Sequence, residues 1–177
     1  MKRLLLTICL ISMTLYPVAA IAGSGYMGLK IGGYFPQRGF LKNADTGIGS
    51  EVRGGYYFNE NIASEMEIGY YQTKVPIFIL GHETKTTFSI FPISLNLVFA
   101  KQFENIKPYI KSGVGYYLAQ YQGSFETYDG ASFGYQVGAG ISINNFGIEG
   151  KYVSAKPTIN GTIFDLSGPI VTIFIVF

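Results

Sequence analysis

The chain has 177 residues, of which 48% are hydrophobic and 14% are charged, and its net charge is +2. The surplus positive charge comes from Lys2 and Arg3, so the rest of the chain, with 11 basic and 11 acidic residues, is neutral. This balance gives no support to the binding of nucleic acids or of acidic substrates.

Residues 1–22 have the three parts of a secretory signal peptide: a positive start, an apolar stretch from Leu4 to Leu15, and the small-x-small cleavage site Ala20-Ile21-Ala22. The apolar stretch is shorter than the roughly 20 residues that a spanning helix needs. We therefore predict a cleaved signal peptide over 1–22 and one mature domain over 23–177. Cys9 leaves with the signal, so the mature chain is expected to hold neither a disulfide nor a thiolate metal site.

Eight segments of the mature chain alternate between apolar and polar or small residues, the period of a β-strand. They are residues 25–35, 49–58, 62–73, 87–100, 107–121, 132–143, 146–155 and 168–177. The mature chain has no apolar run long enough for a spanning helix, and the other structure that pairs every backbone group in a membrane is a closed barrel. We therefore predict an all-β fold, an eight-stranded antiparallel up-and-down transmembrane β-barrel.

The connections between the predicted strands are short on one side and long on the other. The short ones are Asn59-Glu60-Asn61, residues 101–106 and Asn144-Asn145. Asparagine suits such turns because it tolerates left-handed backbone angles. The longer ones are residues 36–48, 74–86, 122–131 and 156–167. Short turns to the periplasm and long loops to the outside are typical of outer-membrane barrels.

Charged residues of the predicted strands fall on one face of the alternation. Leu29 and Ile31 would face lipid, for example, with Lys30 on the opposite face. A Lys or Arg side chain that faces the middle of the membrane costs about 2–4 kcal/mol, so we predict that the charges face the lumen. They balance four against four, as buried charges must be paired. This interior charge network consists of Lys30, Glu51, Arg53, Glu65, Glu67, Lys111, Glu149 and Lys151.

The alternative is a soluble sandwich or barrel with these charges on its outer surface. Two features oppose it. Aromatic residues are doubled near predicted strand ends, at Tyr34-Phe35, Tyr56-Tyr57-Phe58, Tyr70-Tyr71 and Tyr116-Tyr117, as in the girdles at the two membrane interfaces. The last strand, Pro169–Phe177, is apolar, and it would be an aggregation-prone edge in a soluble protein. In a barrel it pairs with the first strand.

The N-terminal strands carry a resemblance to a known family. Gly25–Pro36 resembles the first strand of the small outer-membrane β-barrel domain family, which includes OmpA-like and OmpX-like proteins. Glu51–Phe58 and Ala63–Tyr70 resemble its second and third strands. One departure is Pro169, early in the last strand, where proline is tolerable only as the first residue or at a bulge.

The C-terminal strand extends the resemblance to the end of the chain. Val171, Ile173, Ile175 and Phe177 stand at alternate positions, and they resemble the signature by which outer-membrane proteins are recognised for barrel assembly. The resemblance implies a monomer in the cell outer membrane, surrounded by membrane lipid and lipopolysaccharide. It also implies the barrel assembly machinery as a partner during biogenesis.

The leading functional hypothesis is a non-enzymatic barrel that anchors surface loops for envelope integrity or partner contact. An eight-stranded barrel has room only for its own side chains, so a large pore is not expected, and a narrow channel is one alternative. The other is a lipid-modifying enzyme for acyl transfer or deacylation, which needs a nucleophile and a base. The mature chain has one histidine, His82, at a predicted loop tip. We predict no catalytic residues, no cofactor and no metal.

One predicted loop is unusually apolar. Val75, Pro76, Ile77, Phe78, Ile79 and Leu80 form an apolar run, followed closely by His82. The third and fourth strands are therefore predicted to continue above the membrane as a hairpin that turns at Gly81-His82. Two roles are open for this candidate contact loop: its apolar face packs over the barrel mouth, or it meets a partner, lipopolysaccharide or another strand.

Overall fold

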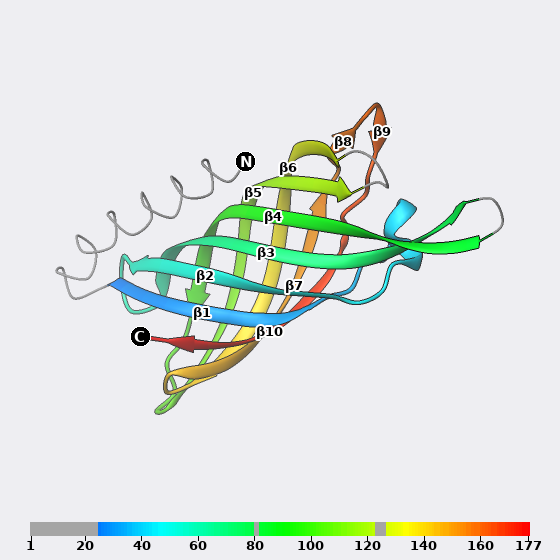
Figure 1. Cartoon of the computed structure of the whole chain (residues 1–177). Coiled ribbons are helices and arrows are strands. Elements are labelled where there is room, and N and C mark those ends of the chain that lie inside the picture. The colour runs from blue at the N-terminus through cyan, green and yellow to red at the C-terminus, as the bar shows by residue number, and fades with distance from the viewer. Residues whose placement is uncertain (1–24, 80–81, 123–126) are drawn as a thin grey trace.

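The computed structural model describes residues 25–79, 82–122 and 127–177, so the predicted signal peptide lies outside the described residues. Eight strands close into one antiparallel barrel in the order β1-β10-β7-β6-β5-β4-β3-β2, which confirms the predicted fold (Figure 1). These strands are β1 (Gly25–Tyr34), β2 (Gly47–Tyr57), β3 (Ile62–Ile79), β4 (His82–Ala100), β5 (Ile106–Gln122), β6 (Thr127–Ile143), β7 (Phe146–Ala155) and β10 (Gly168–Val176). None of the described residues lies in a helix long and apolar enough to cross a membrane.

The barrel closes between β1 and β10. The pairing runs from Tyr34 opposite Ile170 to Gly28 opposite Val176, and the backbone N–H of Phe177 donates to the Met27 carbonyl at 2.8 Å. The apolar last strand therefore has a partner on each side, because β7 pairs along its other edge. Pro169 is the second residue of this strand.

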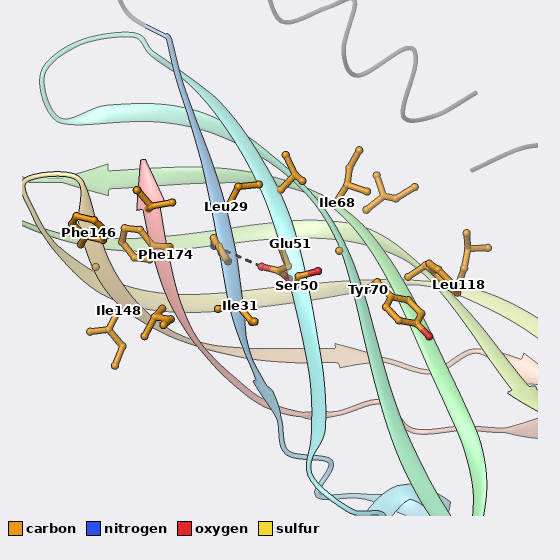
Figure 2. Close-up of a pocket in the computed structure, with 18 of the residues that line it drawn as sticks. Leu29, Ile31, Ser50, Glu51, Ile68, Tyr70, Leu118, Phe146, Ile148 and Phe174 are labelled. Atoms are coloured by element: carbon orange, nitrogen blue, oxygen red, sulfur yellow. Dashed lines mark ion pairs between the residues drawn. The ribbon is translucent and has the colours of Figure 1, made fainter. Parts of the chain in front are cut away.

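The outside of the wall is apolar. Leu29, Ile31 and Ile148 are about half exposed, and Figure 2 shows part of this surface together with the Lys30–Glu51 ion pair, which lies on the inner side. The four residues of the C-terminal signature also face outward, with Val171, Ile173 and Phe177 exposed and Ile175 half-buried. A lipid bilayer would cover this surface, since an apolar belt of this extent is not stable in water.

The connections at one end of the barrel are tight turns. Between β2 and β3, the side-chain oxygen of Asn59 accepts hydrogen bonds from the backbone N–H groups of Asn61 and Ile62, both at 2.9 Å. Between β6 and β7, Asn144 has a φ of 53°, in the left-handed region that asparagine tolerates.

At the other end, two of the four connections predicted as long are largely strand: the one between β3 and β4, which confirms the predicted hairpin, and the one between β5 and β6, which was expected to be a loop. β3 and β4 continue past the predicted boundaries at Thr73 and Thr87, and β5 and β6 leave only residues 123–126 between them. Above the membrane a strand pair can continue wherever each strand satisfies the other's backbone groups. Figure 1 shows β3 and β4 reaching beyond every other strand.

The two remaining connections carry short elements of their own. The β1–β2 connection contains the 3₁₀ helix η1 (Gly39–Asn43). The β7–β10 connection contains a small hairpin of β8 (Thr158–Ile159) and β9 (Thr162–Ile163). Both connections send apolar side chains into the mouth of the barrel, as described below.

Candidate functional site: the filled lumen and the outer end

A layer of charges fills the middle of the lumen. All eight residues of the predicted interior network are at least 96% buried, and they come from β1, β2, β3, β5 and β7. They share one face because they stand at inward positions of the period-two alternation. They share one level because closure brings strands that are far apart in the sequence into register around the barrel.

Lys30 lies at the centre of this layer. Its ammonium group is 2.8 Å from a carboxylate oxygen of Glu149 and 3.7 Å from one of Glu51, and it also donates to Glu67. Carboxylate oxygens of these three glutamates lie within 4.8 Å of one another. Such a triad could hold a divalent cation, but in this structure the Lys30 ammonium takes that position and pairs with all three carboxylates.

Three further cations surround the same carboxylates. Lys111 reaches Glu67 at 2.6 Å and Glu149 at 2.8 Å across the lumen. Lys151 bonds Glu51 at 2.5 Å, which connects β7 to β2 through the interior. These contacts link strands that are not neighbours in the wall, and they compensate for the loss of hydration that burying each charge entails.

The fourth cation, Arg53, differs because it also contacts aromatic rings. Its guanidinium group is 3.4 Å from a Glu65 oxygen and 3.9 Å from the centre of the Phe174 ring. This stacked geometry suits arginine, whose planar group is less strongly hydrated than an ammonium. Arg53 therefore joins the charge layer to the aromatic residues below it.

Neutral side chains from β4 and β6 add further hydrogen bonds to the layer. The side-chain amide of Gln136 donates to Glu67 at 2.8 Å and to Asn96 at 2.6 Å, and Asn96 donates to Glu67 at 3.2 Å. The sequence pattern predicts the charged members of this network but not these amides. The sequence does carry a signal for them, because both amides stand at inward-facing positions of alternating strands.

Aromatic residues close the lumen below the charges, toward the tight turns. Tyr109 donates to Glu149 at 2.7 Å, and its ring lies 6.2 Å from that of Phe174. Each ring faces a glycine directly opposite on the adjacent strand, Gly140 for Tyr109 and Gly147 for Phe174. A Cβ at Gly147 would stand 2.2 Å from the Phe174 ring, so the absent side chain makes space for the aromatic.

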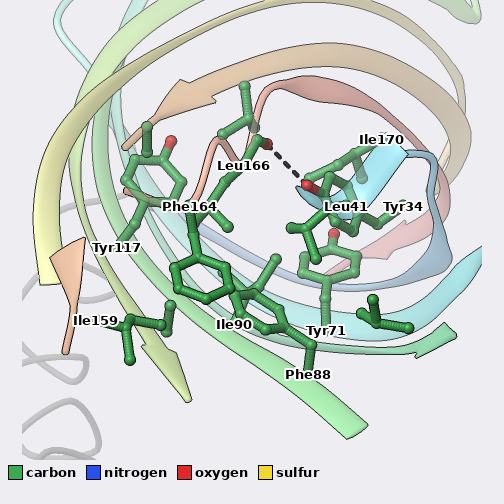
Figure 3. Close-up of a cluster of buried hydrophobic side chains, with 14 residues drawn as sticks. Tyr34, Leu41, Tyr71, Phe88, Ile90, Tyr117, Ile159, Phe164, Leu166 and Ile170 are labelled. Carbon is green, nitrogen blue, oxygen red and sulfur yellow. Dashed lines mark hydrogen bonds between the residues drawn. The ribbon is translucent and has the colours of Figure 1, made fainter. Parts of the chain in front are cut away.

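A hydrophobic cluster closes the opposite end of the lumen, the barrel mouth. Here Phe88 of β4 stacks on Phe164, with ring centroids 5.6 Å apart, and Leu41 of η1 is fully buried (Figure 3). Burying a side chain of this size stabilises the fold by about 1.5–3 kcal/mol. We call this group the mouth cluster; its buried members are Tyr34, Leu41, Tyr71, Val75, Phe88, Ile90, Tyr117, Ala119, Val153, Ala155, Ile159, Phe164, Leu166 and Ile170.

The doubled aromatic residues divide between the two faces of the wall. At Tyr70-Tyr71 and Tyr116-Tyr117, the first tyrosine is exposed outward and the second is buried in the mouth cluster. This follows from the alternation, since consecutive strand residues face opposite ways. Only one residue of each pair therefore contributes to a girdle.

Hydrogen bonds hold the β7–β10 connection in the mouth. The hydroxyl of Tyr34 donates to the Leu166 carbonyl at 2.8 Å, the dashed line in Figure 3, and the Leu166 N–H donates to Ala155 at 2.9 Å. The sequence pattern predicts only a loop over residues 156–167. Its signal was Asn160-Gly161, a typical two-residue hairpin turn, and both residues have positive φ angles, 48° and 76°.

Asp165 orders the same connection from its outer side. Its carboxylate accepts from the Ser167 N–H at 2.9 Å and lies 3.9 Å from the Lys156 ammonium. Partial burial alone would raise the pKa of Asp165, but the Ser167 hydrogen bonds and the charges of Lys156 and Arg38 outweigh it and hold the pKa below its usual value. The carboxylate therefore binds this loop most strongly in its charged form.

The candidate contact loop is the end of a strand pair. β3 and β4 stay paired up to Ile79 and His82, so His82 begins β4 and does not form the turn. Their pairing with neighbouring strands ends earlier, at Gln72 toward β2 and at Thr87 toward β5. We call residues 75–86 the outer hairpin. Val75 is buried in the mouth cluster and Pro76 is half-buried, whereas the side chains of 77–84, His82 included, lie outside those described.

Comparison with solved structures finds several bacterial proteins that this chain resembles. Neisserial surface protein A matches with a TM-score of 0.59 and 14% identity, over 86% of this chain and 95% of that chain. The N-terminal β-barrel domain of Pseudomonas aeruginosa OprF matches at 0.45 and 12%, over 86% and 96%. Ail, the attachment invasion locus protein of Yersinia pestis, in complex with the heparin analogue sucrose octasulfate, matches at 0.48 and 18%, over 87% and 97%.

Identities this low show the fold alone, and no curated protein sequence matches the chain significantly. The family comparison is more informative. The family model described as the outer membrane protein beta-barrel domain matches residues 5–162, most of the chain. This agrees with the closed barrel, the apolar outer wall and the buried charges. The chain belongs to the outer membrane protein beta-barrel domain family and is located in the outer membrane.

Proposed function

We propose that this protein is a non-enzymatic outer-membrane barrel that uses its closed wall as an anchor and presents the outer hairpin to a partner at the cell surface. The observation that carries the proposal is that β3 and β4 stay paired beyond the last pairing of either neighbour. Within the described residues, neither edge of the outer hairpin is therefore paired with another strand. Open strand edges are a common site of strand addition by a partner chain.

The packing of the lumen supports an anchor in preference to a channel. A solute would have to pass the mouth cluster, the charge layer and the aromatic rings near Tyr109 in turn. Among the described residues, the charged side chains of the lumen are almost fully buried against one another, so they do not line a water-filled path. We expect no stable large conductance in planar lipid bilayers. Such a conductance would contradict the closed lumen.

The charge layer also offers little to a hydrolytic or transfer reaction. Its carboxylates are each paired with lysine or arginine, as in a structural network, and a general base must be free to accept a proton. Replacing His82 with alanine should leave lipid composition unchanged in cells that express the protein. A changed acylation pattern would favour the enzyme alternative.

Deleting residues 76–82 tests the outer hairpin directly. The truncated chain should fold in lipid, as judged by far-UV circular dichroism, because the barrel pairing below Val75 is untouched. In cells that lack the wild-type protein, we expect this variant to reach the cell surface. We expect it to fail to restore two properties: exclusion of a membrane-impermeant dye by the cells, and binding of a partner at the cell surface. A matched control replaces residues 123–126, the tip between β5 and β6, with Asn-Gly. If the truncated hairpin restores both properties as well as the control does, the contact role is wrong.

A further inference from the structure

The two edges of the outer hairpin differ in the backbone groups that they present. The Lys74 carbonyl accepts from the Asp45 N–H at 2.8 Å, so Lys74 presents its backbone groups to the β2 side of the sheet. Strand residues two apart face the same edge, and Pro76 therefore lies on this edge without an N–H to donate. Asp45 and Pro76 together oppose the addition of a further strand to β3.

The β4 edge of the outer hairpin contains no proline. The N–H of Lys101, just after β4, donates to the Pro108 carbonyl of β5 at 3.1 Å, so the odd-numbered residues of β4 face the β5 side. Within the described residues, the pairing of β4 with β5 ends at Thr87. The next odd-numbered positions toward the tip are Lys85 and Glu83. A partner strand would therefore add to β4 at these two positions.

The sequence of the β4 edge is complementary to itself. Residues 82–86 read His-Glu-Thr-Lys-Thr. Two such strands that pair antiparallel around Thr84 place Glu83 of each copy opposite Lys85 of the other. The positions that face the new partner also meet in this register, as backbone hydrogen bonding requires. A register centred on Glu83 or on Lys85 would instead place like charges opposite each other, which is unfavourable.

We propose that the outer hairpin binds a second copy of this protein, β4 edge to β4 edge, in the register centred on Thr84. The inference rests on the proposed function, in which the outer hairpin is the contact element, and it names the partner. The Lys85 ammonium already pairs with the Asp45 carboxylate at 2.9 Å. An ammonium group has three donors, so Lys85 can keep this bond and also meet Glu83 of the other copy.

The symmetry of this contact decides where the second copy lies. The two-fold axis that relates two identical antiparallel strands is perpendicular to their sheet. The outer hairpin continues the barrel wall, so this axis lies close to the plane of the membrane (Figure 1). A half-turn about such an axis turns the second barrel upside down. The two copies therefore belong to two membranes that face each other, and each barrel remains a monomer in its own membrane.

The size of the contact explains how it would act. Thr84 is seven residues beyond Phe91 of the outer aromatic girdle, about 23 Å along the strand and roughly 18 Å along the membrane normal at a typical tilt. Two hairpins would thus hold two membranes about 35 Å apart. A contact of a few residues is far smaller than the roughly 1,200 Å² of a stable interface, so many copies must act together. The inferred role is adhesion between membranes that carry this protein.

Charge exchange between two populations of vesicles tests the inference. Phosphatidylcholine vesicles that contain the purified barrel carry one of two dyes, and the fraction of particles with both colours measures their contact. We expect wild-type vesicles to cluster. Lys85→Glu or Glu83→Lys, present in both populations, should reduce clustering about tenfold, because like charges then stand opposite each other. Mixing Lys85→Glu vesicles with Glu83→Lys vesicles should restore the wild-type level.

This restoration separates the contact between copies from the contact within one copy, since Lys85→Glu also loses its Asp45 partner. The double variant Glu83→Lys, Lys85→Glu should cluster with itself but not with the wild type. The matched control is Lys156→Glu, an exposed lysine of the β7–β10 connection, which should cluster as the wild type does. Circular dichroism checks the folding of each variant.

Three results would overturn the inference: wild-type vesicles that stay separate, mixed variants that cluster no better than either variant alone, or an equal loss in Lys156→Glu. Each of these results leaves the proposed function standing. That proposal fails on a different observation, namely that the chain without residues 76–82 restores dye exclusion and surface binding.

Discussion

Glu67 is the residue on which the charge layer depends most. It accepts from Lys30, Lys111 and Lys151, and its second oxygen also accepts from Gln136 and Asn96. Replacing it with glutamine keeps the shape of the side chain, removes the charge and turns one of its two acceptor oxygens into an amide donor. The three ammonium groups would then share the carboxylates that remain.

The expected cost of Glu67→Gln is about 3–5 kcal/mol in the free energy of unfolding, the usual result of removing one partner from a buried ion pair. Lys111→Met alone should cost a similar amount, because it leaves Glu65, Glu67 and Glu149 with one cation fewer. The double variant should lose less than the sum of the two, since it removes one charge of each sign and restores neutrality.

Urea unfolding in lipid vesicles measures these free energies. The chain has no tryptophan, so far-UV circular dichroism is the appropriate signal. Glu60→Gln, in the exposed turn between β2 and β3, is the control and should change stability by less than about 0.5 kcal/mol. A cost below about 1 kcal/mol for Glu67→Gln, or additive costs in the double variant, would refute the coupled network.

Two further predictions concern packing and pH. Gly147→Ala should destabilise the barrel by about 1–3 kcal/mol, because the new Cβ would overlap the Phe174 ring, whereas Gly150→Ala on the same strand meets nothing within 4 Å and should be neutral by the same urea assay. The pKa of Asp165 is lower in the folded protein than the roughly 3.9 of an unfolded chain, so its stabilisation is complete above that pH and is lost as the pH falls through the folded value. The protection of the Ser167 amide against hydrogen exchange, taken relative to its intrinsic rate at each pH, should fall on acidification below about pH 4 in the wild type, and an Asp165→Asn variant that keeps the same acid dependence would contradict this assignment.

The sequence by itself determined the eight strands of the barrel and the face on which each residue lies. Period-two alternation is a local property, and the cost of exposing Lys30 or Lys151 to lipid decides which face is inward. The same reasoning identified the tight turns at Asn59 and Asn144, where asparagine supplies the backbone angles and side-chain bonds that a turn requires.

Only the tertiary structure decided which inward residues meet. Lys151 and Glu51 are 100 residues apart and lie on strands that do not pair, so their contact depends on closure and on the stagger of all eight strands. The mouth cluster depends on closure in the same way. Leu41 and Phe164 are apolar residues in connections, and they become buried because a closed ring of strands leaves an open mouth that apolar side chains fill.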